Sequence, residues 1–331
     1  DSVLNDGDGL FKSLHLGPWL QAAPDGILAP VLSLRQFTQM SHCFTPCRCC
    51  SQSPIVLYWT KSCDEVIDMS VVGKMADDWQ AAGIEEGNLV LVHSSIKRTL
   101  HRFRDQGYEA TAKDVLDSFL LALGNTGTLM LPLFNFDFTR GVPFYFDETP
   151  SHMGALTELG RAHPGAVRTG HPIYSFAVIG REAERFSGVN NFSGYGPDSP
   201  FAMLRHSPNG KIAVLDLPDQ HSQTFYHHVE EFCDAPYRYH KKFTAPYRDS
   251  DGVEEDRTYG LFVRNIEEGV LTHVDPAGEL MWKRGLYTGF RPGTGPGLRI
   301  VKAQRMFDFV AGIISAGGAE GRLYRIEERQ E

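Results

Sequence analysis

Short apolar runs that alternate with helix-like stripes are the feature that most constrains the fold of this chain. The runs "NLVLVH" (88–93), "GTLMLPLF" (127–134) and "KIAVLDL" (211–217) have the near-continuous apolar character of strands that are buried on both faces. Apolar residues also recur at three- and four-residue steps before the first of these runs, at Val66, Met69, Val72, Met75 and Trp79, and between the first two, at Val115, Phe119 and Leu123. Strands that alternate with helices predict an α/β body in layers.

Two later segments change that picture from a purely parallel sheet to a mixed one. "YRYHKKFTAPYRD" (237–249) and "DRTYGLFVRN" (256–265) alternate polar and apolar residues, which is typical of antiparallel strands. We therefore expect an α/β fold with a mixed, partly antiparallel sheet covered by helices. Residues 1–64 show no sustained period, so we interpret them as an N-terminal extension to one domain at 65–331.

Charge and cysteine content limit the classes of function. Lys and Arg number 32 against 41 Asp and Glu, and this net charge of −9 argues against nucleic-acid binding. No apolar run is long enough for a membrane span, and the first residues do not resemble a signal peptide, so we expect a cytoplasmic protein. The chain begins without Met and is expected to be trimmed or partial. The cysteines at 43–50 lack a second metal-binding pair, which favours free thiols over a metal cluster.

Three short motifs carry residue types that suit catalysis or binding. His93, Ser94 and Ser95 follow an apolar strand, where α/β sheets bind ligands, although either serine could instead cap the next helix. His171 precedes a proline, which favours an extended or turn conformation at the entry to a strand. In "TFYHHVEE", His227 and Glu230 share a helix face and Thr224 can cap that helix.

These pieces, taken in order, resemble the aminoglycoside 3-N-acetyltransferase family. The matching segments are "LVLVHSSI", "LGNTGTLMLPLF", "GALTELGRAHPGAVRTGHPIYSFAVIG", "GYGPDSP" and "TFYHHVEE". The resemblance covers roughly residues 66–245 and implies an N-acyltransferase that uses acetyl-CoA, or another acyl-CoA, without a metal. The acceptor is then a small-molecule amine of an aminoglycoside, an amino sugar or a related compound, and a homodimer is one assembly that the sequence leaves open.

The resemblance also implies roles for individual residues. His171 is expected to be the base, and Glu230 to orient it or to hold the amine, with His227 on the same helix. The residues expected to line the acyl-CoA site are His93, Ser94, Ser95, Lys97, Leu133, Phe134, Thr169 and Ser175. Those expected near the acceptor are Thr224, Asp198 and Tyr195. The chemistry suits these residue types, because an imidazole can take the proton that an amine must lose before it attacks a thioester.

Two departures from the family pattern leave the acceptor open. Thr169 stands where the family usually has serine, and "VLDLPDQHSQ" lacks the usual glycine turn before the Thr-Phe helix. His240, Lys241 and Lys242 add cationic or titratable groups, which would suit an anionic acceptor better than a polycationic one. A serine- or metal-dependent hydrolase and a non-catalytic amino-sugar-binding protein are the two alternatives.

Overall fold

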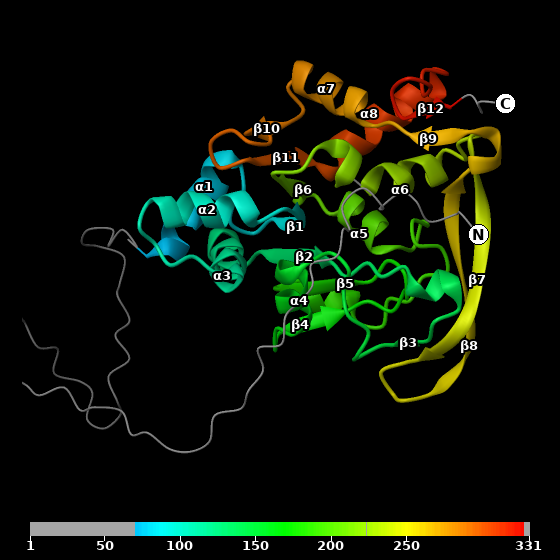
Figure 1. The fold of residues 1–331 in the computed structure, drawn as a ribbon, viewed down its shortest axis with the longest axis horizontal. Coiled ribbons are helices and arrows are strands. Elements are labelled where there is room, and N and C mark those ends of the chain that lie inside the picture. The colour runs from blue at the N-terminus through cyan, green and yellow to red at the C-terminus, as the bar shows by residue number, and fades with distance from the viewer. Residues whose placement is uncertain (1–69, 223, 328–331) are drawn as a thin grey trace, which may run out of the picture. The chain divides into compact units, whose positions relative to one another are not determined.

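The computed structural model describes residues 70–222 and 224–327, and these form an α/β body around a seven-stranded mixed sheet (Figure 1). The strand order is β10-β11-β6-β1-β2-β5-β4. The central strands β6, β1 and β2 run parallel, whereas β11 and β10 on one side and β5 and β4 on the other pair antiparallel. Their bounds are β1 (Leu89–Ser94), β2 (Thr128–Pro132), β4 (Ala166–Arg168), β5 (Phe176–Gly180), β6 (Gly210–Leu215), β10 (Thr288–Gly289) and β11 (Leu298–Lys302).

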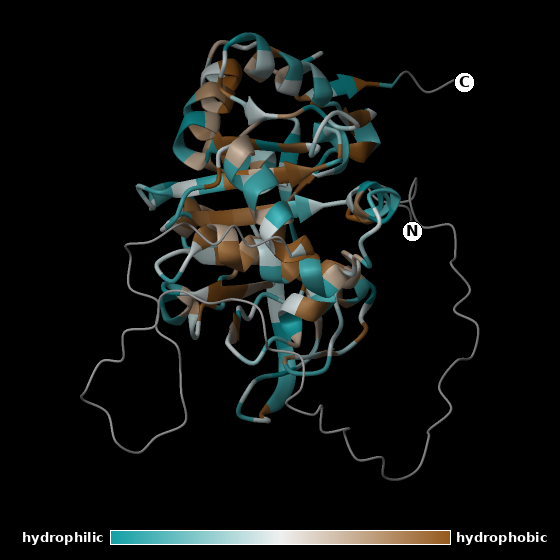
Figure 2. Ribbon diagram, turned by 90° about the vertical axis from the view of Figure 1, so that its left-hand side faces the viewer, coloured by the Kyte–Doolittle hydropathy of each residue, from teal (hydrophilic) through white to brown (hydrophobic). Residues whose placement is uncertain are grey.

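Both faces of this sheet are buried because alternate residues of each central strand enter different cores. Leu89 and Leu91 of β1 join one apolar cluster, and Val90 and Val92 join the other. Hydrophobic strands accordingly occupy the middle of the body in Figure 2, between helices whose outer turns are polar. Strands buried in this way cannot show a polar–apolar alternation, which is why their sequences are continuously apolar.

Helices cover the sheet on both sides. The cluster that contains Val90 includes residues of α1, α2, α3 and α4, and the cluster that contains Leu91 includes residues of α5, α6, α7 and α8. The helices are α1 (Val71–Ala82), α2 (Lys97–Asp105), α3 (Ala112–Leu123), α4 (Ala155–Arg161), α5 (Pro200–His206), α6 (Phe225–Phe232), α7 (Asp275–Lys283) and α8 (Ala303–Ser315). Short 3-10 helices are η1 (Asp137–Arg140), η2 (Ala183–Phe186), η3 (Asp219–His221) and η4 (Ile266–Glu268).

A long hairpin stands beside the main sheet. The 11-residue strands β7 (Arg238–Arg248) and β8 (Glu254–Arg264) pair antiparallel along their whole length, and β3 (Phe144–Tyr145) adds to β7 in parallel. Strands β9 (Val270–Thr272) and β12 (Tyr324–Ile326) form a separate antiparallel pair. Figure 1 shows the hairpin running along the side of the body next to α6.

Most elements expected from the sequence are confirmed. The mixed sheet, the β7–β8 hairpin, the Gly83 stop of α1 and the Thr111 cap of α3 are all present. Residues 300–302 are wrong as helix, because they pair with β6 as part of β11 before α8 begins. The expected extension at 1–64, its boundary and the cysteines at 43–50 lie outside the described residues. Within the described ranges, no helix is both long and apolar enough to cross a membrane.

The capping box of α3 gives a direct test of the helix assignment. The Asp114 N–H donates to Thr111 Oγ1 at 3.3 Å, and the Thr111 N–H donates to Asp114 Oδ2 at 2.8 Å. We expect Thr111→Ala to lower the free energy of unfolding by about 1 kcal/mol, measured by urea denaturation. Thr111→Ser keeps the hydroxyl and serves as the control, so an equal loss in both variants would contradict the capping role.

Candidate active site

The His-Ser-Ser segment ends the central strand β1. His93 pairs with Val214 of β6, and the Ser95 N–H donates to Leu215 O at 2.9 Å. Helix α2 starts only after Ile96, at an N-cap that has no side-chain hydrogen bond. The interpretation of Ser94 or Ser95 as a helix cap is therefore wrong. Ser94 is the last residue of β1 and Ser95 follows it, and both are half-buried at the carboxyl end of a parallel strand, where α/β sheets place ligands.

His93 is buried beneath this loop. Burial lowers the pKa of its imidazole to about 3, and the nearby Arg299 acts in the same direction. The ring centroid lies 6.3 Å from that of Phe134, which is itself 1% exposed. His93 is thus a neutral imidazole at physiological pH. The exposed part of the segment is formed by Ser94, Ser95 and Lys97 rather than by His93.

An open groove of about 370 Å³ lies next to this loop. It is lined by Ser95, Lys97, Arg98, His101, Asp216 and Gly293. Arg98 Nε lies 2.8 Å from Asp216 Oδ1, so this guanidinium is already paired, whereas Lys97 is exposed. The basic residues after β1 therefore differ in whether they can bind a ligand. Lys97, at the start of α2, is the cation that a ligand in the groove would contact.

Leu133 and Phe134 directly follow strand β2 and are buried in the core. The Leu133 N–H donates to Ser175 O at 2.8 Å, and neither side chain is more than 1% exposed. Phe134 packs on Tyr174 with ring centroids 4.5 Å apart. Leu133 and Phe134 are therefore part of the buried packing between the His93 loop and the segment that carries Tyr174.

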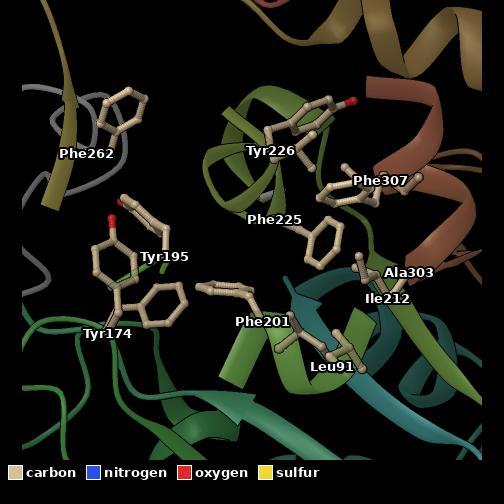
Figure 3. Close-up of a cluster of buried hydrophobic side chains, with 14 of the residues drawn as sticks. Leu91, Tyr174, Tyr195, Phe201, Ile212, Phe225, Tyr226, Phe262, Ala303 and Phe307 are labelled. Atoms are coloured by element: carbon tan, nitrogen blue, oxygen red, sulfur yellow. The ribbon is translucent and has the colours of Figure 1, made fainter. Parts of the chain in front are cut away.

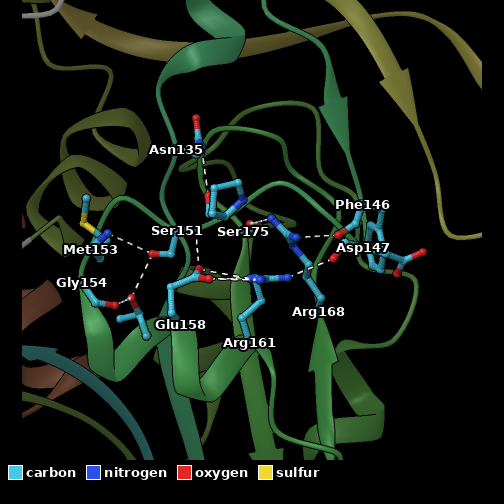
Figure 4. Close-up of polar contacts among 12 residues, drawn as sticks. Asn135, Phe146, Asp147, Ser151, Met153, Gly154, Glu158, Arg161, Arg168 and Ser175 are labelled. Carbon is cyan, nitrogen blue, oxygen red and sulfur yellow. Dashed lines mark hydrogen bonds and ion pairs between the residues drawn. The ribbon is translucent and has the colours of Figure 1, made fainter. Parts of the chain in front are cut away.

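Thr169 and Ser175 hold the segment around His171 to its neighbours. The Thr169 hydroxyl accepts from the Phe176 N–H at 2.9 Å. Ser175 Oγ lies 3.4 Å from Leu133 O and 3.4 Å from Arg168 Nη2. Figure 4 shows Ser175 beside Arg168, near the contacts of Ser151, Glu158 and Arg161. Both hydroxyls are fully buried and bonded to protein groups. They therefore shape the loop that carries His171.

His171 is completely buried in that loop. Its Nδ1 accepts the Ile173 N–H at 3.2 Å and the Tyr174 N–H at 3.0 Å. Burial lowers the pKa of this imidazole to about 3, although the backbone groups of Gly260 and Phe192 act in the opposite direction. A Cβ at Gly194 would lie 3.4 Å from His171 Cε1, so the 193–196 loop covers the ring.

Helix α6 contributes a second histidine together with a buried carboxylate. Glu230 Oε2 lies 2.7 Å from His227 Nδ1 and 2.8 Å from Arg238 Nε, and Glu230 Oε1 accepts the Tyr237 hydroxyl at 2.9 Å. Burial alone would raise the pKa of Glu230, but Arg238, His227 and Tyr237 together hold it below its usual value. Glu230 is therefore an ionised carboxylate with three partners around it.

The neighbouring face of α6 points into the apolar core. His228 Nδ1 lies 2.7 Å from Tyr195 O, and burial lowers the pKa of His228 to about 4. The Ser193 hydroxyl donates to Glu231 Oε2 at 2.7 Å. Helix α6 thus holds the 193–196 loop in place through His228 and Glu231, while its other face carries the His227–Glu230 pair.

The tyrosines of two loops connect the two histidines. Tyr174 and Tyr195 lie together with ring centroids 4.7 Å apart, and Figure 3 shows them side by side near Phe201. The Tyr174 centroid lies 6.3 Å from that of His171, and the Tyr195 centroid lies 5.3 Å from that of His227. Both histidines therefore belong to one region of the molecule, with an aromatic pair between them.

The direct pairing of His171 with Glu230 does not occur. The polar partners of Glu230 in the described part of the chain are His227, Tyr237 and Arg238, so the carboxylate orients His227 instead. The reason is the three-residue spacing on α6, which brings these two side chains onto one helix face. The sequence did not single out Arg238, which meets Glu230 only because the chain turns back after α6.

The three residues expected near the acceptor differ in burial and in their contacts. Tyr195 is 4% exposed and packs on His227. Thr224 occupies the N-cap position of α6 without a side-chain capping bond, so its expected cap is not formed. Asp198 is exposed on the 194–201 loop. Among the described residues, no group of three or more His, Cys, Asp or Glu side chains could hold a metal ion.

Comparison with known proteins assigns this arrangement to a family. The sequence model described as aminoglycoside 3-N-acetyltransferase matches residues 91–314. Aminoglycoside N(3)-acetyltransferase VII of Streptomyces paromomycinus is 30% identical over 184 residues, which is 49% of this chain and 61% of that protein. Aminoglycoside N(3)-acetyltransferase VIII of Streptomyces fradiae is 29% identical over 194 residues, or 52% of this chain and 64% of that protein. The chain thus spans about three-fifths of the length of these relatives.

Solved structures share the fold. The structure of AAC-IIIb with CoASH superposes with a TM-score of 0.63 at 22% identity, covering 75% of this chain and 97% of that chain. The sisomicin-bound structure of AAC-VIa gives a TM-score of 0.59 at 21% identity, covering 74% of this chain and 98% of that chain. Because the family model matches more than half of its residues, the chain belongs to the aminoglycoside 3-N-acetyltransferase family.

Proposed function

We propose that this protein transfers the acetyl group of acetyl-CoA to a primary amine of an aminoglycoside or a related amino sugar. The observation that carries the proposal is the His227–Glu230 pair, which lies in the same region as His171, within a chain of this family. A buried, ionised carboxylate that holds an imidazole is suited to proton removal from an amine. The relatives with CoASH and with sisomicin bound support the same two ligands.

The loop at the carboxyl end of β1 is the proposed place for the acyl-CoA arm. Ser94 and Ser95 offer hydroxyl and backbone groups there, and Lys97 offers an exposed charge beside the groove for a phosphate. Leu133, Phe134, Thr169 and Ser175 are buried, so we propose that they shape the wall of the site rather than contact the ligand with their polar groups. His93 supports the loop from below.

The acceptor is proposed to approach from the side of α6 and the 194–201 loop. Tyr195 packs on His227, Thr224 begins α6 and Asp198 is an exposed carboxylate on the loop. Asp198 can attract an amine, whereas Lys242 of β7 is exposed and lies 6.0 Å from the centre of the Phe192 ring. Because both charges lie on the proposed acceptor side, polycationic and anionic amines should both be tested as acceptors.

The function is tested by release of free thiol from acetyl-CoA in the presence of aminoglycosides, amino sugars and amino acids. We expect thiol release with at least one amine of the first two classes and none without an amine. Hydrolysis of acetyl-CoA at the same rate without any amine would contradict transfer. Loss of activity with a chelator but no effect of coenzyme A would favour a metal hydrolase.

Coenzyme A is also expected to stabilise the folded protein. At 100 times its dissociation constant, a ligand that binds only the native state adds about 2.7 kcal/mol, so the melting temperature should rise by several degrees. Scanning calorimetry at increasing coenzyme A concentrations measures this shift. Desulfo-coenzyme A serves as a probe without the thiol, and adenine, which lacks the pantetheine arm, serves as the control. The absence of any concentration-dependent shift with coenzyme A would oppose an acyl-CoA site.

A further inference from the structure

A glycine-rich loop forms part of the groove beside the His-Ser-Ser segment. Residues 291–297 connect β10 with β11, and Gly293 of this loop lines the groove together with Ser95 and Lys97. The φ angles of Gly293 and Gly297 are 78° and 75°, in the left-handed region that glycine adopts readily. A loop of this composition has many backbone conformations open to it, so its position in the folded protein depends on contacts from outside.

Two residues from outside the loop supply such contacts. Asp216 Oδ1 accepts the Gly293 N–H at 2.9 Å, and the Asp216 N–H donates to Gly297 O at 3.0 Å. Arg98 Nη2 donates to Gly295 O at 2.8 Å. Arg98 and Asp216 are themselves joined by an ion pair, with 2.8 Å between Nε and Oδ1. This pair, which we call the Arg98–Asp216 clasp, therefore holds the loop at three backbone positions.

The clasp lies at the edge of the sheet where the acyl-CoA arm is proposed to bind. Asp216 directly follows β6, and Arg98 is in the first turn of α2. Strand β6 runs parallel to β1, and the Ser95 N–H donates to Leu215 O at 2.9 Å. Both clasp residues line the groove. Loss of the clasp would therefore free one wall of the groove and leave Ser95 and Lys97 in place.

Asp216 has two features that lower the stability of the fold. Its φ is 53°, in the left-handed region that is unfavourable for a residue with a Cβ. Its side chain is 6% exposed, and Oδ2 has no hydrogen-bond partner among the residues that the structure describes. Backbone strain and a buried acceptor without a donor both cost free energy, and such costs are concentrated where geometry serves function. Fold stability alone therefore does not explain an aspartate at this position.

Attraction of the ligand by charge does not explain Asp216 either. Coenzyme A is anionic through its phosphates, and the cations that line the groove are Lys97 and Arg98. A carboxylate 2.8 Å from Arg98 reduces the positive potential in the groove. If Asp216 acted only through its charge, a neutral residue there would strengthen coenzyme A binding. If Asp216 acts by holding the loop, losing its hydrogen bonds would weaken binding.

We propose that the Arg98–Asp216 clasp positions the 291–297 loop as a wall of the acyl-CoA groove, which makes Asp216 a positioning residue for the acyl donor. This inference rests on the proposed function through its donor, acetyl-CoA. The clasp holds the loop before the ligand arrives, so binding does not have to order it. Because Asp216 takes no part in the chemical step, its loss should raise KM for acetyl-CoA and leave kcat at saturating acetyl-CoA nearly unchanged.

Two substitutions at Asp216 separate hydrogen bonding from charge. Asp216→Gly and Asp216→Asn remove the same negative charge, and both new residues tolerate a positive φ. Only asparagine keeps a carbonyl oxygen that can accept from Arg98 and Gly293. We expect Asp216→Gly to raise both Kd for coenzyme A and KM for acetyl-CoA by about tenfold, with little change in kcat. Asp216→Asn should keep all three constants close to the wild-type values. Isothermal titration calorimetry and thiol-release kinetics measure them.

An ion pair elsewhere on α2 gives the matched control. Asp78 Oδ2 lies 2.6 Å from Arg102 Nη2, and neither residue is among those that line the groove. Asp78→Ala should leave Kd and KM unchanged. Hydrogen exchange of peptides that cover residues 291–297 should be faster in Asp216→Gly than in the wild type, and unchanged in Asp78→Ala.

Several results would overturn the proposal. Coenzyme A binding by Asp216→Gly that is equal to or tighter than that of the wild type would do so, as would equal losses in the glycine and asparagine variants. A lower melting temperature of Asp216→Gly with unchanged Kd would show a role in folding only. If the wild type binds no coenzyme A, the acyl-CoA groove and the clasp both fail. If coenzyme A binds and the variants differ as expected, but no amine causes thiol release, acetyl transfer fails and the clasp remains part of a coenzyme A site.

Discussion

Replacing Asp219 with alanine is expected to lower the free energy of unfolding by about 3–5 kcal/mol, because the change leaves a buried guanidinium without its counter-ion. Asp219 is 5% exposed and its partner Arg299 is 1% exposed, with Oδ1 ion-paired to Arg299 Nη2. Oδ2 accepts the hydroxyls of Tyr226 at 2.9 Å and Tyr287 at 2.8 Å. One substitution therefore removes the partner of three buried donors.

Guanidinium denaturation of the wild-type and Asp219→Ala proteins measures the difference. The exposed pair of Glu279 with Arg291 is the matched control, because it is also a carboxylate–arginine contact but lies in solvent. Glu279→Ala is expected to change stability little, since water already screens the two charges. Equal losses in the two variants would mean that burial does not determine the strength of the Asp219 contact.

Glu230→Gln is expected to reduce both stability and turnover. The amide cannot carry the charge that pairs with Arg238, so a buried ion is left without its partner at a cost of about 3–5 kcal/mol. His227 loses the anion that orients it, and kcat is expected to fall by about 10²–10⁴-fold. Thiol-release kinetics and urea denaturation at pH 7 measure the two effects on the same preparation.

The stability effect of Glu230→Gln should also depend on pH. The pKa of Glu230 is lower in the folded protein than in the unfolded chain, despite burial, because Arg238, His227 and Tyr237 favour the carboxylate. Its stabilising contribution is therefore fully present above the unfolded value of about 4.3 and is lost as pH falls through the lower folded value. The difference between wild type and variant should shrink in acid, and a difference that stays constant down to pH 3 would contradict this linkage.

The sequence predicted those parts of the fold that depend on local pattern. The central strands, the Thr111 cap and the Gly83 stop follow from apolar runs and single-residue chemistry. Helix α2 was missed because its basic residues resemble a solvated surface, although Thr99 and Phe103, four positions apart, are buried. Helix α5 is not predicted from the sequence, because Ser199 and Pro200 suit a turn as well as a helix start.

Only part of the candidate site could be predicted from local sequence pattern. The pairing of His227 with Glu230 follows from their spacing on one helix. The contact of Arg238 with Glu230 depends on how the chain turns after α6, and the bonding of His171 depends on a turn geometry that residue identities do not specify. Tertiary packing, rather than composition, decides these two features.

Because the β7–β8 ladder is long, a change of its register at a distant point would alter the candidate active site. Arg238 stands opposite Arg264 at the base of this ladder, and Gly260, further along β8, bonds the backbone of Phe192 and Gly194 beside His171. A one-residue insertion within either strand would send the following side chains to the reverse side of the ribbon. Insertions in the turn near Gly252 would leave the register of the two strands unchanged. The hairpin can therefore vary in evolution at this turn but not along the paired strands.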